Sequence, residues 1–348
     1  MRFENVYIES LGYHLPKNVV TSEDLERRLG PLYEKLKLPY GRLEMMSGIR
    51  ERRFFEKGVF PSQVSSLAGE HALSKTDVDR KEIGCLISGS VCRDFLEPAT
   101  ASVIHHSLKL PNDSLVFDIS NACLGVLNGM VHVANMIEAG QIQAGLVVSG
   151  ENGGPLVETT VESLLADPNP TRAKIKTAFA SMTIGSAAVA VLLTHRNLSD
   201  RGHRLLGAVA RAETRFNDLC QGNEDMGMGG DSAPLMETDS ETLMHEGCKL
   251  AKTTWDLTRS SLGWCNENVD RVFCHQVGHI HRKLLYESLA LDLQKDFSTL
   301  EYLGNTGSAA LPVTLAIGEE QGVVQKGDSV ALLGIGSGLN CLMMGVEW

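Results

Sequence analysis

An internal repeat constrains the fold of this chain more than any other feature. Each half contains, in the same order, a Val-Asp-Arg triplet, an apolar run, an Asn-led helical stretch and a second apolar run. These features begin at Val78, Ile83, Asn121 and Gly145 in the first half, and at Val269, Val272, Asn305 and Ser329 in the second. Such self-similarity is typical of a duplicated α/β unit, although chance likeness between α/β segments is the alternative. We therefore predict two related halves, 1–195 and 205–348, packed as one body.

The apolar runs of the first half indicate strands that are buried on both faces. They cover residues 83–89, 115–119, 145–150 and 187–193. Strands of this composition occur in layered α/β folds, where helices cover both sides of a sheet. A chain of 348 residues is long enough for one large core or for two fused halves.

Composition and charge exclude several classes of protein. Lys and Arg number 32 against 43 Asp and Glu, and the net charge of −11 disfavours nucleic acid and anionic membranes as partners. No apolar run approaches the roughly 18 residues of a membrane-spanning helix. The first residues, acidic and strand-like, do not read as a signal peptide, so we expect a cytoplasmic protein. The eight cysteines include no Cys-x-x-Cys pair, and we expect free thiols.

Two segments do not fit the repeat. Residues 152–177 read as an inserted helical hairpin or loop, and residues 221–235 read as a glycine-rich mobile loop. Both are consistent with surface irregularity. They are equally consistent with the walls of a substrate channel, in which Met226 and Met228 would be adaptable apolar contacts.

Cys123 is the cysteine that stands apart. It follows the apolar run 115–119 and a short polar turn, and it begins a stretch that is apolar almost all round and so predicts a buried helix. A thiol at the start of such a helix feels the positive end of the helix dipole, which lowers its pKa and favours the nucleophilic thiolate. The alternative is an ordinary buried cysteine.

His275 ends the apolar run that opens the second repeat, at the edge of the sheet where α/β active sites collect. His279 and His281 follow closely and raise the possibility of a metal site. No carboxylate or thiolate stands at ligand spacing on the same face, so we expect no metal and place both residues on a helix surface.

Two polar, glycine-rich segments complete the candidate chemistry. Asn305 either caps the helix that follows it or aims an amide donor at a developing oxyanion. The segment 333–340 is a strand and turn with glycines at 334, 336 and 338, and it could present a backbone amide to a substrate oxygen. No Lys-Ser/Thr follows it, so it is not a phosphate-binding loop.

Together these motifs resemble the thiolase superfamily and, within it, the 3-oxoacyl-ACP synthase III (ketoacyl synthase III) branch. The matching segments are Asn121-Ala122-Cys123, His275-Gln276, Gly304-Asn305-Thr306, Gly48-Ile49-Arg50-Glu51-Arg52 and Gly336-Ser337-Gly338. They occur in the family's order and cover essentially the whole chain. The resemblance implies an α/β thiolase fold, a five-layer αβαβα sandwich of two pseudo-repeated halves, and an obligate homodimer.

The chain departs from that branch in two places. Ketoacyl synthases III usually have a tryptophan and Thr-Arg before Gly-Ile-Arg, where this chain has Arg42 and Met46-Ser47, and Val277-Gly278 replaces the usual Ala-Asn. Residues 90–102, 212–214 and 219–223 and the C-terminal tail instead resemble the olefin-biosynthesis (OleA-type) condensing enzymes. Those enzymes join two fatty acyl-CoA chains head to head without loss of carbon dioxide.

The resemblance implies a Claisen condensation of acyl thioesters through a covalent acyl-cysteine. Cys123 would be the nucleophile, and the backbone amides of Cys123 and Ser337 would form an oxyanion hole. His275 and Asn305 would stabilise the enolate of the second thioester. Glu97, 26 residues before Cys123, would act in the active site of the partner subunit and remove the α-proton of the second thioester. A base is needed because a non-decarboxylating enzyme must form the carbanion by removing a proton. No metal or redox cofactor is implied. The substrates would be acyl-CoA and possibly acyl carrier protein thioesters.

Three alternatives remain open. The first is a conventional decarboxylating ketoacyl synthase III of fatty acid biosynthesis. The second is a papain-like cysteine peptidase, which also uses Cys, His and Asn in this order, although Cys123 lies far from the N-terminus and lacks the expected flanking sequence. The third is a silent partner subunit, against which the complete set of Cys123, His275 and Asn305 argues.

Overall fold

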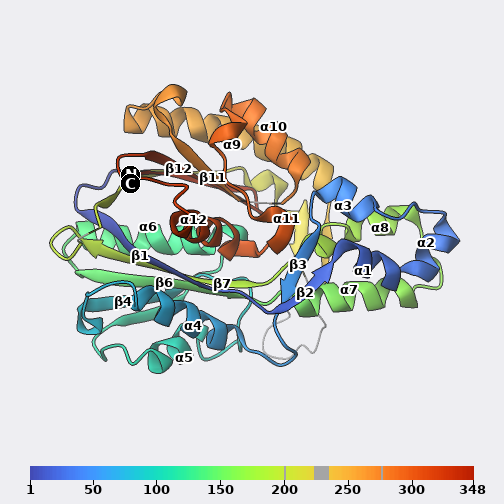
Figure 1. Ribbon diagram of the computed structural model, residues 1–348, viewed down its shortest axis with the longest axis horizontal. Coiled ribbons are helices and arrows are strands. Elements are labelled where there is room, and N and C mark those ends of the chain that lie inside the picture. The colour runs from blue at the N-terminus through green and yellow to red at the C-terminus, as the bar shows by residue number, and fades with distance from the viewer. Residues whose placement is uncertain (200, 223–234, 276) are drawn as a thin grey trace.

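The computed structural model describes residues 1–199, 201–222, 235–275 and 277–348. Its centre is a mixed sheet in which strands from the second half of the chain lie together on one side and strands from the first half lie together on the other (Figure 1). In spatial order these strands are β11 (Arg271–Cys274), β12 (Ser329–Gly336), β13 (Asn340–Glu347), β8 (His203–Ala212), β1 (Val6–His14), β7 (Ala187–His195), β6 (Ala144–Glu151), β4 (Ile83–Ser88) and β5 (Leu115–Asp118). The prediction of strands buried on both faces is confirmed for β4, β6 and β7, which are buried along almost their whole length. It is wrong for the run 115–119, because β5 is an edge strand on which Leu115 is 54% exposed.

The sheet consists of two similar parts joined at a narrow point. Only the pairs Tyr7↔Arg204 and Ile8↔His203 connect β1 to β8. Outward from this join, β1, β7 and β6 pair antiparallel, and β6, β4 and β5 pair parallel. On the other side, β8, β13 and β12 pair antiparallel, and β12 and β11 pair parallel. An isolated parallel bridge from Val272 to Asp296 stands where β5 stands in the first part. This matching order is the topology expected of a duplicated unit.

Helices lie in three layers around the two parts of the sheet (Figure 1). The helices α4 (Pro61–Leu73) and α5 (Thr100–Ser107) cover the outer face of the first part. The helices α9 (Ser240–Leu262) and α10 (His279–Leu289) cover the outer face of the second. Between the two parts lie α6 (Gly125–Glu138) and α12 (Ala310–Glu320), which are buried along most of their length. The fold is the thiolase fold that the sequence predicted, with helix and sheet layers alternating.

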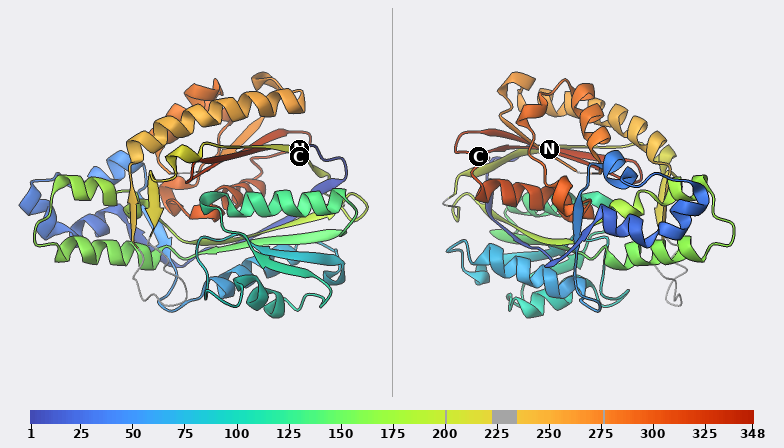
Figure 2. Two further views of the ribbon diagram at one scale, coloured as in Figure 1. Left: turned by 180° about the vertical axis from the view of Figure 1, so that it is seen from behind. Right: turned by 45° about the vertical axis from the view of Figure 1, so that its right-hand side comes forward.

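A smaller group of helices extends from one end of the sandwich (Figure 2). It consists of α1 (Ser22–Arg28), α2 (Gly30–Leu36), α3 (Arg42–Ser47), α7 (Gly154–Ala166) and α8 (Arg172–Ala178). These helices share a core of their own, which includes Leu25, Leu43, Val157 and Ile175. The segment 152–177 thus contains the two helices of a hairpin. Most of the second unusual segment, with Met226 and Met228, lies outside the described residues.

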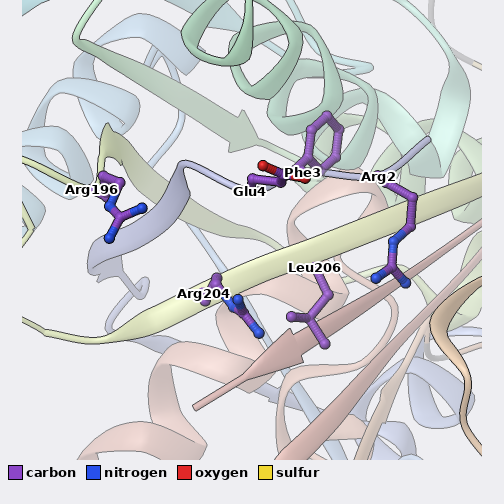
Figure 3. A pocket seen from close by; sticks show the side chains of 6 residues that line it. All are labelled: Arg2, Phe3, Glu4, Arg196, Arg204 and Leu206. Atoms are coloured by element: carbon purple, nitrogen blue, oxygen red, sulfur yellow. The ribbon is translucent and has the colours of Figure 1, made fainter.

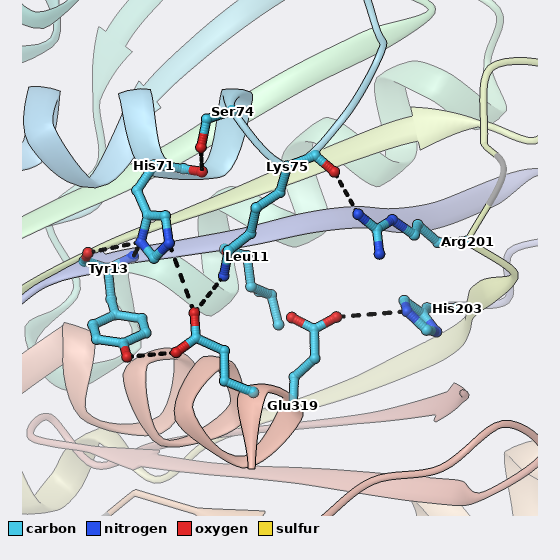
Figure 4. Close-up of polar contacts among 9 residues, drawn as sticks. Leu11, Tyr13, His71, Ser74, Lys75, Arg201, His203 and Glu319 are labelled. Atoms are coloured by element: carbon cyan, nitrogen blue, oxygen red, sulfur yellow. Dashed lines mark hydrogen bonds and ion pairs between the residues drawn. The ribbon is translucent and has the colours of Figure 1, made fainter. Parts of the chain in front are cut away.

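Polar contacts bridge the two parts of the fold close to their join (Figure 4). Glu320 of α12 accepts hydrogen bonds from Tyr13 at 2.6 Å and from Lys75 at 2.6 Å. On the same helix, Glu319 lies 3.7 Å from His203, whose ring stacks on Trp348 at 4.0 Å between centroids. Burial lowers the pKa of His203 to about 4, so this histidine is neutral at neutral pH and the contact is not an ion pair. No helix of the described chain is long and apolar enough to cross a membrane.

Candidate active site

Cys123 lies in a short 3₁₀ turn, η2 (Ala122–Leu124), which leads directly into α6. The turn has an unusual shape, because Ala122 adopts a left-handed φ of 44°, which costs a residue with a Cβ about 1 kcal/mol. A Cβ added to Gly125 would lie 2.0 Å from the carbonyl oxygen of Gly89, so the start of α6, directly after η2, packs closely against the loop after β4. The prediction that Cys123 begins the helix itself is corrected: α6 starts two residues later.

Burial raises the pKa of the Cys123 thiol to about 12, and the charges of Glu151 and, less strongly, Cys220 contribute to the shift. The prediction of a lowered pKa is therefore wrong for the protomer. Two effects raise the pKa of this thiol: burial of the thiolate away from water and the negative charge of Glu151. Together they exceed the lowering that the positive end of the α6 dipole would cause. Cys123 is a neutral thiol at neutral pH, so its proton must be taken up as the sulfur attacks.

The last turn of the chain lies beside Cys123. A Cβ on Gly336 would be 3.6 Å from the backbone nitrogen of Cys123. Nδ2 of Asn340 donates to the carbonyl oxygen of Ser337 at 3.1 Å and to Oδ1 of Asn121 at 3.3 Å. The turns that carry Ser337 and Cys123 are thus joined through one amide side chain, an arrangement consistent with an oxyanion hole built from their two backbone amides.

His275 follows β11, and its backbone N–H donates to the carbonyl oxygen of Leu333 in β12 at 3.0 Å. The residue is 5% exposed, and neither ring nitrogen has a hydrogen-bond partner among the described residues. Burial, assisted by the charge of His281, lowers the pKa of His275 to about 3. The imidazole is therefore neutral, with one N–H and one lone pair left for a substrate.

The two histidines that follow differ from each other. His279 is exposed, as predicted, and lies against α3, since a Cβ on Gly48 would be 2.9 Å from its Cβ. His281 is half-buried, and burial lowers its pKa to about 4. Its placement on the helix surface is corrected, because the first helical turn of α10 directs it toward His275. The described His, Cys, Asp and Glu residues form no group of three that could hold a metal ion.

Asn305 is 8% exposed and is fixed through its backbone. Its N–H donates to the carbonyl oxygen of Thr183 at 2.9 Å, and its own carbonyl oxygen accepts from Gly185 at 2.8 Å. Oδ1 accepts the N–H of Gly307 at 3.0 Å, which leaves the side-chain NH₂ without a partner in the described chain. The prediction that Asn305 caps the helix after it is wrong, because the cap residues of η7 and α12 are Thr306 and Ala309 and neither element has a side-chain cap. The role of Asn305 as a donor to an oxyanion stays a prediction.

The elements that carry these three residues converge on β12. The turn η2 packs on the end of β12 and on η7 (Gly307–Ala309), the 3₁₀ turn just after Asn305. His275 is bonded to the same strand through its backbone. The structure therefore gathers Cys123, His275 and Asn305, which are spread over 183 residues of sequence, into one region between the two parts of the fold.

Glu97 lies apart from this group in the protomer. It belongs to the loop between β4 and α5 and is exposed, without a hydrogen bond or ion pair to any described residue. Its neighbours Phe95 and Leu96 are 49% and 51% exposed, and Val91 in the same loop is 54% exposed. The loop thus presents apolar side chains to solvent around one carboxylate.

Sequence reasoning missed Glu151, the last residue of β6. It is 4% exposed and accepts hydrogen bonds from the backbone of Val91 and Cys92 and from Ser308. Nothing in its local sequence marks it, because it ends an apolar strand as many surface glutamates do.

A surface pocket of about 340 Å³ lies away from all of these residues (Figure 3). It is lined by Arg2, Phe3, Glu4, Arg196, Arg204 and Leu206, close to the join between β1 and β8. None of the candidate site residues contributes to it, so the chemistry of the site is not in this pocket.

Comparisons with known proteins agree with the geometry. The thiolase N-terminal domain matches residues 45–194, and the C-terminal domain of 3-oxoacyl-[acyl-carrier-protein (ACP)] synthase III matches residues 260–348. A protein from Shewanella oneidensis named acyl-CoA:acyl-CoA alkyltransferase is 44% identical, and the alignment covers 100% of both chains. The protein of the same name from Xanthomonas campestris is 36% identical, again over 100% of both. This chain belongs to the acyl-CoA:acyl-CoA alkyltransferase family.

Members of this family are condensing acyltransferases with the thiolase fold, and the chain matches their solved structures throughout. A crystal structure of cerulenin-bound Xanthomonas campestris OleA superposes with a TM-score of 0.94 at 36% identity, covering 100% of this chain and 98% of that one. Other structures of that protein carry bound lauric acid and lauroyl-CoA, or substitutions of a cysteine, a glutamate and a histidine. A ketoacyl synthase III from Koribacter versatilis is 25% identical over 98% of this chain, a more distant relationship.

Proposed function

We propose that the protein condenses two fatty acyl-CoA molecules head to head, without decarboxylation, to a 2-alkyl-3-oxo acid. The observation that carries the proposal is that a half-buried thiol, Cys123, lies in a turn packed both on the strand next to His275 and on the turn after Asn305. The side-chain donors of His275 and Asn305 are unpaired in the described chain. A nucleophile beside free donors suits a reaction that first forms an acyl enzyme and then develops negative charge on a second substrate.

In the first half-reaction, the sulfur of Cys123 attacks the carbonyl carbon of an acyl-CoA. The tetrahedral oxyanion accepts hydrogen bonds from the backbone amides of Cys123 and Ser337, whose turns are joined through Asn340. The bond to the sulfur of coenzyme A then breaks, and the leaving thiolate takes up the proton that Cys123 loses. The products are an acyl-cysteine and free coenzyme A.

In the second half-reaction, a base removes a proton from the α-carbon of a second acyl-CoA. The ring N–H of His275 and the amide of Asn305 stabilise the enolate oxygen, and the α-carbon attacks the carbonyl carbon of the acyl-cysteine. The bond to the Cys123 sulfur breaks, and the leaving thiolate takes up the proton that the base removed. Hydrolysis of the resulting 2-alkyl-3-oxoacyl thioester by water gives the acid. None of these steps needs a metal or a redox cofactor, because each moves only protons and electron pairs.

The base that we propose is the partner subunit's Glu97 in a homodimer. Glu97 is exposed in the protomer among exposed apolar residues, a composition that suits a buried contact with a second copy. The strand β5 nearby is an open edge of the sheet, and Leu115 on it is 54% exposed. The glutamate and cysteine substituted in the Xanthomonas campestris structures lie 26 residues apart in that chain, as Glu97 and Cys123 do here.

The alternative is a decarboxylating synthase of fatty acid biosynthesis that uses malonyl-ACP. The match of residues 260–348 to a ketoacyl synthase III domain favours it, while the higher identity to the alkyltransferases favours our proposal. We propose acyl-CoA as the donor, because the relatives with the higher identity are named acyl-CoA:acyl-CoA alkyltransferases. We also propose that the reaction takes place in the cytoplasm.

The test offers the purified protein a long-chain acyl-CoA alone, and separately together with malonyl-ACP. We expect one acyl adduct on Cys123 by mass spectrometry, absent in Cys123→Ala, and a 2-alkyl-3-oxo acid from acyl-CoA alone. Condensation that occurs only with malonyl-ACP and releases carbon dioxide would replace the proposal with the decarboxylating alternative. An acyl adduct that still forms in Cys123→Ala would contradict the assignment of Cys123 as the nucleophile.

A further inference from the structure

We infer that Glu151 is a positioning residue. It fixes the position of the loop that carries Glu97 relative to the Asn305 turn of the same chain. Its effect is therefore exerted on the active site of the partner subunit. The inference rests on the proposed function, in which Glu97 is the base for condensation across the dimer.

One side of the Glu151 carboxylate binds the beginning of the Glu97 loop. Oε1 accepts the backbone N–H of Val91 at 2.9 Å, and Oε2 accepts that of Cys92 at 3.2 Å. Two adjacent N–H groups on the two oxygens of one carboxylate fix both the position and the direction of the chain at that point.

The other side of the same carboxylate binds the Asn305 turn. Oε1 accepts the hydroxyl of Ser308 at 2.6 Å and its backbone N–H at 3.2 Å. A Cβ on Gly307 would lie 3.1 Å from the carboxyl carbon of Glu151, so the turn closes directly on this group. The hydroxyl of Ser308 also contacts that of Ser149 at 2.9 Å, within the strand that ends at Glu151.

The far end of the Glu97 loop is held in the same way. The two oxygens of Asp118 accept the backbone N–H groups of Thr100 and Ala101, each at 2.8 Å. Between the two carboxylates, Asp94 accepts the N–H of Ser62 at 2.9 Å. The remaining stretch, 95–98, is exposed and is therefore the part of the loop that can reach a second subunit.

The charge of Glu151 is the feature that a purely structural role does not explain. Glu151 is buried, and no Lys, Arg or His of the described chain forms an ion pair with it. A buried carboxylate without a cation is costly, so the hydrogen bonds that it accepts from Val91, Cys92 and Ser308 must offset its lost solvation. The same charge helps to raise the pKa of the Cys123 thiol. The carboxylate of Glu151 thus disfavours the thiolate of Cys123 in the same chain. We attribute its presence to the hydrogen bonds with which it holds the Glu97 loop.

Substituting Glu151→Gln separates the two effects of this carboxylate. Glutamine keeps the size but offers an NH₂ where one oxygen stood, so the N–H of Cys92 loses its acceptor. We expect condensation to slow by about tenfold or more. We expect alkylation of Cys123 by iodoacetamide to become faster, since Cys220, the other group that acts on the thiol, is unchanged. The alkylation rates of Cys85 and Cys341, which are buried, serve as a control: they should stay unchanged unless the substitution loosens the whole fold.

Two further variants serve as controls. Glu151→Asp keeps the charge but cannot span both partners, so it should slow condensation without speeding alkylation. Glu138→Gln is the matched control, because Glu138 also accepts two backbone N–H groups, those of Glu4 and Asn5 at 3.0 Å each, far from the site. It should change neither rate.

Mixed dimers decide through which active site Glu151 acts. In the reference dimer, one chain carries Cys123→Ala and the other Glu97→Ala, so a single site remains, with its base and its nucleophile on different chains. Glu151→Gln is then added to one chain or the other. We expect slow condensation when it is added to the chain that supplies Glu97, and a near-normal rate when it is added to the chain that supplies Cys123. The reverse result overturns the inference, whereas an inactive reference dimer overturns the proposed base itself.

Discussion

Asn340 donates a hydrogen bond to Asn121 across 3.3 Å and thereby links the last turn of the chain to the turn that carries Cys123. The two residues are 219 positions apart in the sequence. Because the same NH₂ group also binds the carbonyl oxygen of Ser337 at 3.1 Å, it controls the spacing of the two backbone amides proposed for the oxyanion hole.

Removing this link should impair acyl transfer. In Asn340→Ala both hydrogen bonds are lost, at a cost of about 1 kcal/mol each. We expect acylation of Cys123 to slow by roughly tenfold, as measured by the rate of adduct formation with a long-chain acyl-CoA in rapid-quench mass spectrometry. Asn340→Asp, which keeps the shape but cannot donate, should be equally slow. An unchanged acylation rate in both variants would mean that the link does not set the geometry of the hole.

Loss of either free donor should affect the second half-reaction and not the first. His275→Ala and Asn305→Ala each remove a group that faces the enolate, and each lost donor should raise the condensation barrier by roughly 3 kcal/mol, about a hundredfold in rate. Acyl-Cys123 should still form and should accumulate. Single-turnover assays that follow the adduct and the condensed product separately make the distinction. Normal condensation in both variants would remove these residues from the mechanism.

The sequence predicted the fold well because its signals were local and repeated. Uniformly apolar runs such as 187–193 indicate strands that are buried on both faces, and β7 is buried along almost its whole length. The division of the chain into the halves 1–195 and 205–348 stays a prediction. The errors concern properties that depend on tertiary packing. The turn at Ala122 delays the start of α6, and burial beside Glu151 raises the pKa of Cys123 where the helix end alone would lower it. Glu151 could not be found from spacing, because its hydrogen-bond partners are 59 to 157 positions away in the sequence. His281 could not be found either, because its burial depends on the exact phase of one helix.

Burial of neutral histidines should make the protein less stable in mild acid. The unfolded pKa of histidine is near 6.5, and burial lowers the folded pKa of His203 to about 4. The unfolded chain therefore binds more protons between these values, so the stability that the neutral ring contributes is complete above pH 6.5 and is lost as the pH falls toward 4.

His203→Phe tests this dependence, since a phenyl ring can still stack on Trp348 but does not titrate. Between pH 7 and pH 4.5, wild type should lose about 2 kcal/mol more unfolding free energy than the variant. Urea denaturation at the two pH values measures the difference. Glu319 is present in both proteins, so its own titration cancels to first order. Parallel losses in the two proteins would show that His203 is not responsible.

The last prediction concerns Glu97 and distinguishes the two family mechanisms. A decarboxylating synthase forms its carbanion by losing carbon dioxide and needs no base, whereas joining two acyl-CoA molecules requires removal of an α-proton. Glu97→Ala should therefore leave acylation of Cys123 within about twofold of normal and reduce condensation by at least about a hundredfold. Glu97→Asp should retain partial activity, because a carboxylate remains but stands one methylene further away.

When Glu97→Ala and Cys123→Ala chains are co-expressed, half of the dimers contain one chain of each kind, and these should restore about a quarter of wild-type condensation. Full condensation by Glu97→Ala alone would remove the base from this mechanism, and the absence of any restoration would place Glu97 and Cys123 in the same subunit's site.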